Sequence, residues 1–205
     1  MYLKYLKKLP VIILMSSVPL ISSAGEADNT GWYVGGDIAG VATTAKSKNV
    51  FTQKKSVASL GAYGGYNFNE WFGLEGMLTV TGDVANNRAN LDTANFFSLT
   101  MTPKFTHRLS PIASVYAKGG FIYLSYREEY SNNAFPRGSQ ESWSSATGLT
   151  LGVGALFDMS NKIKLRIAYD HIEGSLKYNE SFYFVKPANV QAQLNRVSVG
   201  VHYQF

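Results

Sequence analysis

The sequence predicts an all-β protein, an eight-stranded antiparallel up-and-down transmembrane β-barrel, from three observations. Segment after segment alternates apolar and polar residues with a period of two, which is typical of strands whose two faces meet different environments. The segments are about as long as the tilted strands that cross a bilayer. Their connections alternate strictly between short and long, as expected for a barrel that spans an asymmetric membrane.

Four strands are expected in the first half of the chain, at residues 32–43, 57–68, 71–81 and 96–106. Successive side chains of a strand point to opposite faces, so the alternate apolar residues of each run would face lipid together. These residues are Trp32, Val34, Ile38 and Ala42; Ala58, Leu60, Ala62, Tyr66 and Phe68; Phe72, Leu74, Leu78 and Val80; and Phe97, Leu99, Met101, Pro103 and Phe105. Pro103 weakens the fourth strand, because proline cannot donate to the ladder.

Four more strands are expected at residues 112–126, 146–157, 162–171 and 195–205. Their apolar faces are Val115, Ala117, Phe121 and Tyr123; Leu149, Leu151, Val153 and Phe157; Ile163, Leu165, Ile167 and Tyr169; and Val197, Val199, Val201, Tyr203 and Phe205. The total is even, as in single-chain bacterial barrels. Closure of such a sheet satisfies every backbone hydrogen-bonding group, which hydrocarbon requires.

The connections and the polar faces indicate how the barrel sits. Residues 69–70, 107–111 and 158–161 are expected to be periplasmic turns, and residues 44–56, 82–95, 127–145 and 172–194 to be extracellular loops. A soluble eight-stranded barrel has apolar residues inside. Here the second face of each strand is polar, with sparse charges of both signs, and predicts a narrow polar lumen.

The N-terminus predicts the compartment. Lys4, Lys7 and Lys8 precede an apolar stretch at residues 9–20, and the small residues at 22–24 suit signal-peptidase cleavage. We therefore expect a signal peptide at residues 1–24 and a barrel domain at residues 25–205. The expected location is the outer membrane of a Gram-negative cell, reached through the periplasm.

Composition and motifs argue against several classes of function. Loss of three signal-peptide lysines brings the formal net charge from +5 to +2, so the basic balance does not indicate nucleic acid. The chain has no cysteine, and no metal-binding cluster or phosphate loop is evident, so no metal or cofactor is expected. His171 followed by Ser175 leaves an outer-leaflet lipid-modifying enzyme as an alternative. A non-enzymatic protein is the main expectation.

Several motifs resemble the barrel domain of the outer membrane protein A family. Gly64–Glu75 (GGYNFNEWFGLE) resembles the family's second strand, turn and third strand. Gly31–Gly36 (GWYVGG) is similar to its first strand, Tyr116–Gly120 (YAKGG) to its fifth and Val199–Phe205 (VGVHYQF) to its eighth. The resemblance implies the same barrel across the mature chain. It covers the barrel domain only, without the peptidoglycan-binding domain of the family's larger members.

The resemblance also bears on charges in the lumen. An electrostatic gate of two acid–base pairs crosses the lumen in that family, and Glu75, Lys104 and Arg166 stand where three of its members would be. The period-two pattern independently puts all three on the polar face. The fourth member, a glutamate on the sixth strand, has no counterpart at residues 155–157. We expect the pair Glu75–Arg166 with Lys104 and Lys118 nearby, acting as a lumen plug or as the gate of a narrow pore.

The C-terminus and the loops suggest partners. Val201, Tyr203 and Phe205 resemble the insertion signal read by the outer-membrane assembly machinery. Cations and aromatics of the expected loops are typical of binding surfaces, and lysines there would lie near the phosphates of lipopolysaccharide. The expected binding residues are Lys46, Lys48, Lys54, Lys55, Phe135, Trp143, Tyr178 and Phe182.

The resulting hypothesis is a monomer with a structural or interaction role, whose loops mediate adhesion or colonisation. Its partners would be outer-membrane lipid, lipopolysaccharide and a ligand on a host surface. The alternatives are a narrow pore for small solutes or ions and the lipid-modifying enzyme.

Overall fold

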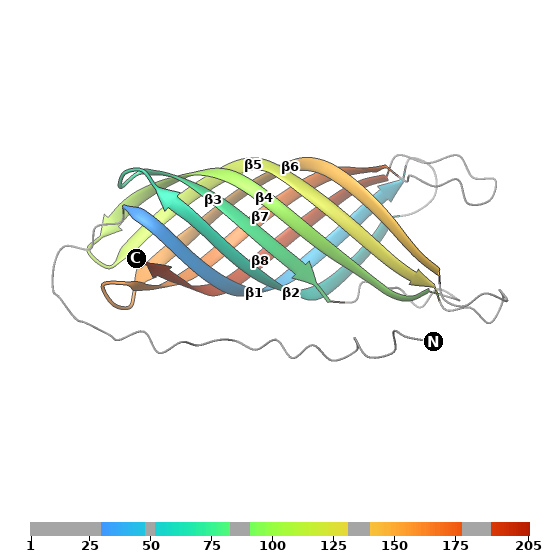
Figure 1. The fold of residues 1–205 in the computed structure, drawn as a ribbon, viewed down its shortest axis with the longest axis horizontal. Helices are drawn as coiled ribbons and strands as arrows, with labels where there is room; N and C mark the ends of the chain where they lie inside the picture. Colours follow the sequence, from blue (N-terminus) through green and yellow to red (C-terminus); the bar gives the residue numbers. More distant parts are fainter. Residues whose placement is uncertain (1–29, 48–51, 83–90, 131–139, 178–189) are drawn as a thin grey trace, which may run out of the picture.

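A computed structural model of the chain describes residues 30–47, 52–82, 91–130, 140–177 and 190–205. The eight strands in these ranges form a closed barrel in which sequence neighbours pair and β1 pairs with β8 (Figure 1). They are β1 (Gly31–Ser47), β2 (Thr52–Asn67), β3 (Phe72–Thr81), β4 (Leu91–Ser110), β5 (Ala113–Tyr130), β6 (Gln140–Asp158), β7 (Ile163–Lys177) and β8 (Val190–Gln204). All eight pairings are antiparallel, so the predicted fold is confirmed. The predicted signal peptide lies outside the described residues.

The two ends of the barrel differ in their connections. The short links 68–71, 111–112 and 159–162 lie at one end, together with the end of β8, and we call this the turn end (Figure 1). The opposite end of the barrel, where β1 ends and β2 begins, we call the loop end. In the described part of the chain, no helix has the length and apolar character needed to span a membrane.

The strands extend further toward the loop end than the hydrophobic pattern predicted. Residues 44–47 belong to β1 and residues 52–56 to β2, although a loop was expected at 44–56. β4, β5, β6, β7 and β8 likewise extend into the expected loops, and His107, which was expected in a turn, lies within β4. The expected loop boundaries were wrong because backbone pairing does not require an apolar face. A ladder can continue beyond the membrane with polar residues on both sides.

Side chains alternate between a lipid-facing wall and the lumen, as the period-two pattern predicted. Along β3 the burial alternates from residue to residue, and the outward positions of the barrel are apolar, with Ile38 at 66% and Phe121 at 74% exposed. Pro103 faces outward as expected. The described β4–β5 register has no pair at Thr102 or Pro103, since the proline offers no N–H to the ladder.

Outward aromatic side chains gather near the turn end. Trp32, Tyr66 and Phe68 form successive ring contacts with centroid separations of 5.1 and 5.2 Å. Trp71 and Phe105 extend this surface onto β4, with ring centroids 6.2 Å apart. Amphipathic and aromatic rings are favoured at the level of lipid headgroups, so these contacts mark one interface of the membrane-facing wall.

Glycines at inward positions make room for large side chains from neighbouring strands. The Tyr33 ring lies across Gly65, and the Tyr63 ring lies across Gly35. A Cβ added at Gly65 would be 2.5 Å from the Tyr33 hydroxyl oxygen and 2.3 Å from a β3 carbonyl oxygen. Several lumen glycines are therefore required by packing, because this narrow barrel has no other space for the rings and charges inside it.

Gly200 provides a test of this packing. A methyl group there would come within 2.3 Å of the Gly36 carbonyl oxygen and 2.5 Å of Asp37 Cβ. We expect Gly200→Ala to lower the free energy of unfolding by roughly 1–3 kcal/mol through overpacking, measured from the urea midpoint at which the folded, heat-modifiable gel band is lost. Gly40→Ala is the control, because nothing lies within 4 Å of its added Cβ. Equal midpoints for the two variants would contradict the packing argument.

Candidate functional site

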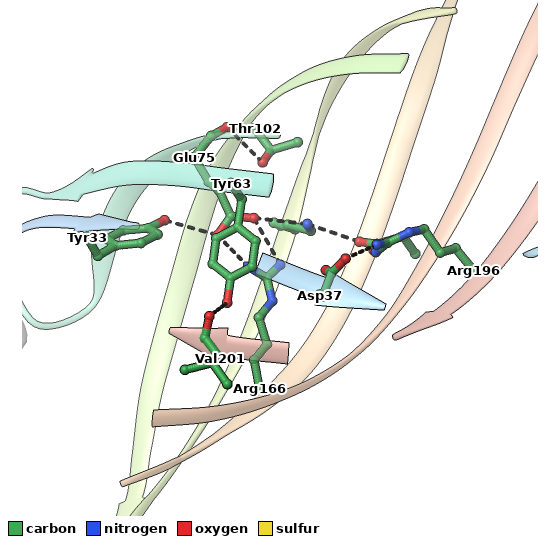
Figure 2. Close-up of polar contacts among 10 residues, drawn as sticks. Tyr33, Asp37, Tyr63, Glu75, Thr102, Arg166, Arg196 and Val201 are labelled. Carbon is green, nitrogen blue, oxygen red and sulfur yellow. Dashed lines mark hydrogen bonds and ion pairs between the residues drawn. The ribbon is translucent and has the colours of Figure 1, made fainter. Parts of the chain in front are cut away.

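The lumen contains a continuous line of alternating charges, which we call the ion ladder. Its members are Arg166, Glu75, Lys118, Asp170, Arg196 and Asp37, in order of contact. They come from five strands (β1, β3, β5, β7 and β8), each from an inward position, and all are buried (Figure 2). The ladder has three cations and three anions, so its formal charge is zero.

Glu75 is the hub of the ladder. Arg166 donates from Nη1 to Oε2 and from Nη2 to Oε1 of Glu75, both at 3.0 Å, which is the two-pronged geometry that guanidinium favours (Figure 2). Lys118 Nζ donates to Oε1 at 3.0 Å, and the Tyr33 hydroxyl donates to Oε2 at 3.1 Å. The Glu75 residue is only 1% exposed, so its charge depends on these four donated hydrogen bonds rather than on water.

From the hub the ladder crosses the barrel to the seam between the first and last strands. Lys118 Nζ lies 3.1 Å from Asp170 Oδ1, and Arg196 Nη1 donates to Asp170 Oδ2 at 3.2 Å. Arg196 Nη2 also donates to Asp37 Oδ1, an interaction visible in Figure 2. One arginine on β8 thus holds carboxylates of β7 and β1, its two neighbours in the barrel wall.

Aromatic side chains lie on the turn-end side of the ladder. Tyr33 and His202 stack with ring centroids 4.5 Å apart, and the Arg166 guanidinium lies 4.0 Å above the Tyr63 ring. The Tyr63 hydroxyl donates to the Val201 carbonyl oxygen at 3.2 Å. Flat rings here complete the packing around the buried guanidinium and hold it by cation–π attraction.

Lys104 enters the lumen without joining the ladder. Its Nζ lies 3.8 Å from the centre of the Tyr33 ring, and among the described residues no carboxylate forms an ion pair with it. Asp158, the nearest candidate for the absent glutamate of the sixth strand, ends β6 and pairs instead with Lys164 at 2.6 Å. Of the four predicted lumen residues, the structure brings Glu75, Lys118 and Arg166 into direct contact and leaves Lys104 beside them.

An apolar layer lies on the loop-end side of the ladder. Six buried side chains form it: Val41, Ile122, Leu124, Ala146, Ile172 and Leu194. The prediction of a polar interior was wrong at these six positions, whereas β3, β4 and β6 contribute buried threonines and a serine to the same part of the lumen. The reason is that inward residues here meet one another across a narrow lumen and pack as a core. A cavity of about 30 Å³ remains between the ladder and this layer, room for a few waters at most.

The residues predicted to guide membrane insertion lie on the lipid-facing side of β8. Val201 is 55% exposed and Phe205 is 67% exposed, and the rings of Tyr203 and Phe205 are 5.2 Å apart. The position is compatible with recognition by assembly machinery, which stays a prediction.

Half of the predicted loop residues lie in strands instead. Lys46 belongs to β1, Lys54 and Lys55 to β2, and Trp143 to β6. In the register, Lys46 pairs with Thr52, Lys54 with Thr44 and Lys55 with Thr43, so all three residues lie on the loop-end part of the β1–β2 hairpin. The prediction that they lie in loops was wrong, because the hairpin continues past the apolar band. Lys48, Phe135, Tyr178 and Phe182 lie outside the described residues.

His171, one of the two residues considered for catalysis, contacts neighbouring polar side chains. His171 Nδ1 lies 2.7 Å from Asn195 Oδ1, and His171 Nε2 lies 3.2 Å from Glu173 Oε1. Both ring nitrogens of His171 are thus directed at side-chain oxygens of Asn195 and Glu173, and the side chain of Ser175 lies outside the described ones. Within the described ranges, no three His, Cys, Asp or Glu residues are grouped so that they could hold a metal ion.

Half of the ladder was not predicted. Asp37, Asp170 and Arg196 fall on the polar faces of their strands in the period-two pattern, but nothing in that pattern connects them with Glu75. The available signal was the inward position of each charge. A ladder needs the barrel register as well, which alone shows that Asp170 pairs with Arg196 and that Asp37 lies at the β1–β8 seam.

Comparison with known proteins shows the family to which the chain belongs. A family model described as "Outer membrane protein beta-barrel domain" matches residues 11–205. The chain belongs to this family. It is therefore a protein of the Gram-negative outer membrane. No curated protein matches the chain.

Solved structures show the same small barrel at low sequence identity. Neisserial surface protein A (NspA) has a TM-score of 0.59 at 16% identity, covering 86% of this chain and 98% of NspA. Ail, the attachment invasion locus protein of Yersinia pestis, has a TM-score of 0.50 at 16% identity, covering 84% and 99%. OprG of Pseudomonas aeruginosa has a TM-score of 0.51 at 13% identity, covering 88% and 98%. At these identities the similarity concerns the fold alone.

Two neighbouring lysines test the energetics of the ladder. Lys118→Met leaves Glu75 and Asp170 each with one fewer buried partner, and we expect it to lower the free energy of unfolding by about 3–5 kcal/mol. Lys104 is the register partner of Lys118 on β4 and forms no ion pair with a carboxylate among the described residues. Lys104→Met should therefore lower the free energy of unfolding by less than about 1 kcal/mol, or raise it. Urea titrations in detergent would measure both values. A Lys104 variant as unstable as the Lys118 variant would show that the ladder assignment is wrong.

Proposed function

We propose that this outer-membrane barrel has a closed lumen and acts from its loop end as a non-enzymatic adhesive protein. The observation that carries the proposal is the filled interior, in which rings, an ion ladder and an apolar layer follow one another along the barrel axis. An eight-stranded barrel has an interior just wide enough for side chains. A role that needs passage through the lumen is therefore less well supported than a role at the surface.

The energetics of the ladder support a plug rather than a pore. Glu75 alone accepts hydrogen bonds from Arg166, Lys118 and Tyr33, and separation of such buried charges costs several kcal/mol per ion. The cavity of about 30 Å³ would not hold a continuous column of water. A narrow pore for small ions, the alternative considered from the sequence, would require the ladder to open.

The β1–β2 hairpin supplies the surface that supports adhesion. Lys46, Lys54 and Lys55 lie within a few register positions of one another at the loop end, which faces the cell exterior in bacterial barrels. Clustered cations favour polyanions such as sulfated or phosphorylated glycans. Ail, whose barrel is similar, has been solved in complex with the heparin analogue sucrose octasulfate.

Conductance across planar lipid bilayers tests the closed lumen. The wild-type protein should give no discrete channel steps, because the ladder and the apolar layer fill the interior. Glu75→Gln removes the hub charge and should increase the frequency of steps, while Gly40→Ala on the outer wall should leave the membrane silent. Regular steps from the wild-type protein would favour the pore instead.

Binding to immobilised heparin tests the basic hairpin. Replacement of Lys46, Lys54 and Lys55 by Gln should weaken binding at least about ten-fold, since each cation near an anionic surface contributes about 1 kcal/mol. The wild-type affinity should also fall as salt is raised. The matched control replaces Arg108 and Lys162, two exposed cations of the turn end, by Gln. A control that weakens binding as much would contradict a specific role of the hairpin.

A further inference from the structure

A polar cluster lies on the outer surface of β7 and β8, at the loop-end edge of their apolar wall. It consists of Tyr169, His171 and Glu173 on β7 and Gln193 and Asn195 on β8, and we call it the rim cluster. His171 pairs with Asn195 in the register and Glu173 pairs with Gln193, so the cluster covers two adjacent strands.

The position of the rim cluster matches the level of lipid headgroups. His171 and Glu173 alternate along β7 with the buried Asp170 and Ile172, so they occupy outward positions. The outward residues next in line toward the turn end are apolar, namely Ile167 on β7 and Val197 on β8, which are 42% and 58% exposed. The cluster therefore begins where the lipid-facing band of these strands ends.

Hydrogen bonds hold the cluster in one arrangement before any ligand binds. The Tyr169 hydroxyl donates to Asn195 Oδ1 at 2.8 Å, and Gln193 Nε2 donates to Glu173 Oε1 at 2.9 Å. His171 bridges the two pairs, since its ring nitrogens lie 2.7 Å from the Asn195 oxygen and 3.2 Å from the Glu173 oxygen. Such preorganisation reduces the entropy lost when a ligand binds.

The hydrogen-bonding groups that the cluster does not use internally indicate the chemistry of the ligand. Among the described residues, the Asn195 amide nitrogen and the Gln193 amide oxygen have no further hydrogen-bond partner, so the cluster offers both a donor and an acceptor. Both oxygens that face His171 are acceptors, so the arrangement favours the imidazolium, whose charge Glu173 balances. A phosphate would need an excess of cations. A sugar, whose hydroxyls both donate and accept, fits this mixed and neutral set better.

We propose that the rim cluster binds the sugar headgroup of lipopolysaccharide in the surrounding outer leaflet. The loop end faces outward in bacterial barrels, so the cluster lies beside this leaflet. The acyl chains of the same molecule would lie along the apolar wall below, against Tyr169 and Val197. The cluster adjoins β1 of the basic hairpin, since Gln193 pairs with Thr44 in the register, but it consists of other residues. Its proposed role does not depend on the proposed adhesive role.

Binding of fluorescent lipopolysaccharide to the refolded protein in detergent tests the proposal. Asn195→Ala combined with Gln193→Ala removes two hydrogen-bonding groups, and we expect affinity to fall roughly ten-fold. Asn95→Ala is the matched control, an outward asparagine of β4 on another part of the rim. The heat-modifiable gel shift verifies that each variant is folded. If the double variant does not fold, Gln193→Ala alone is used in the same binding measurement.

Two further arms separate sugar recognition from other causes. Phosphatidic acid carries a charged phosphate headgroup without a sugar or glycerol diol, so its binding should not depend on Asn195 or Gln193. Heparin binding through the basic hairpin should be unchanged in the double variant. Lipopolysaccharide affinity equal to that of the wild type, or an equal loss of phosphatidic acid binding, would overturn the proposal.

Discussion

The small cross-section of an eight-stranded barrel constrains everything inside this protein. Inward side chains from all strands share one narrow interior, so a charge that enters it is costly unless charges or rings from other strands compensate for the lost water. Glu75 satisfies this requirement with donors from β1, β5 and β7, and the glycines opposite the largest side chains supply the space. Stability and specificity of the lumen therefore come from contacts between strands that are distant in sequence.

A lumen filled in this way supports the proposal that the protein acts from its outer surface. The basic end of the β1–β2 hairpin and the rim cluster of β7 and β8 lie at the same end of the barrel, on different strands. We propose polyanions as ligands of the first and a hydroxyl-rich headgroup as the ligand of the second. The similarity to NspA and Ail concerns the shared scaffold alone.

The sequence predicted the fold because lipid and lumen impose opposite requirements on neighbouring residues. The alternation at Phe97–Phe105 identified both faces of β4 correctly, and the strand number and order followed. Strand ends were not predictable, since pairing at Lys46 or Lys54 continues where the hydrophobic pattern has ended. The partners within the ladder were also beyond the sequence, because a charge such as Arg196 meets Asp37 only once the register between β1 and β8 is known.

Arg196 has a consequence for how the barrel is completed. Its contacts to Asp170 and Asp37 span the seam at which the last strand joins the first. If β8 slipped by one residue, Arg196 and His202 would turn into the hydrocarbon, and if it slipped by two, the arginine would miss both carboxylates. The contacts of Arg196 therefore favour the observed alignment of the final strand over either of these shifts.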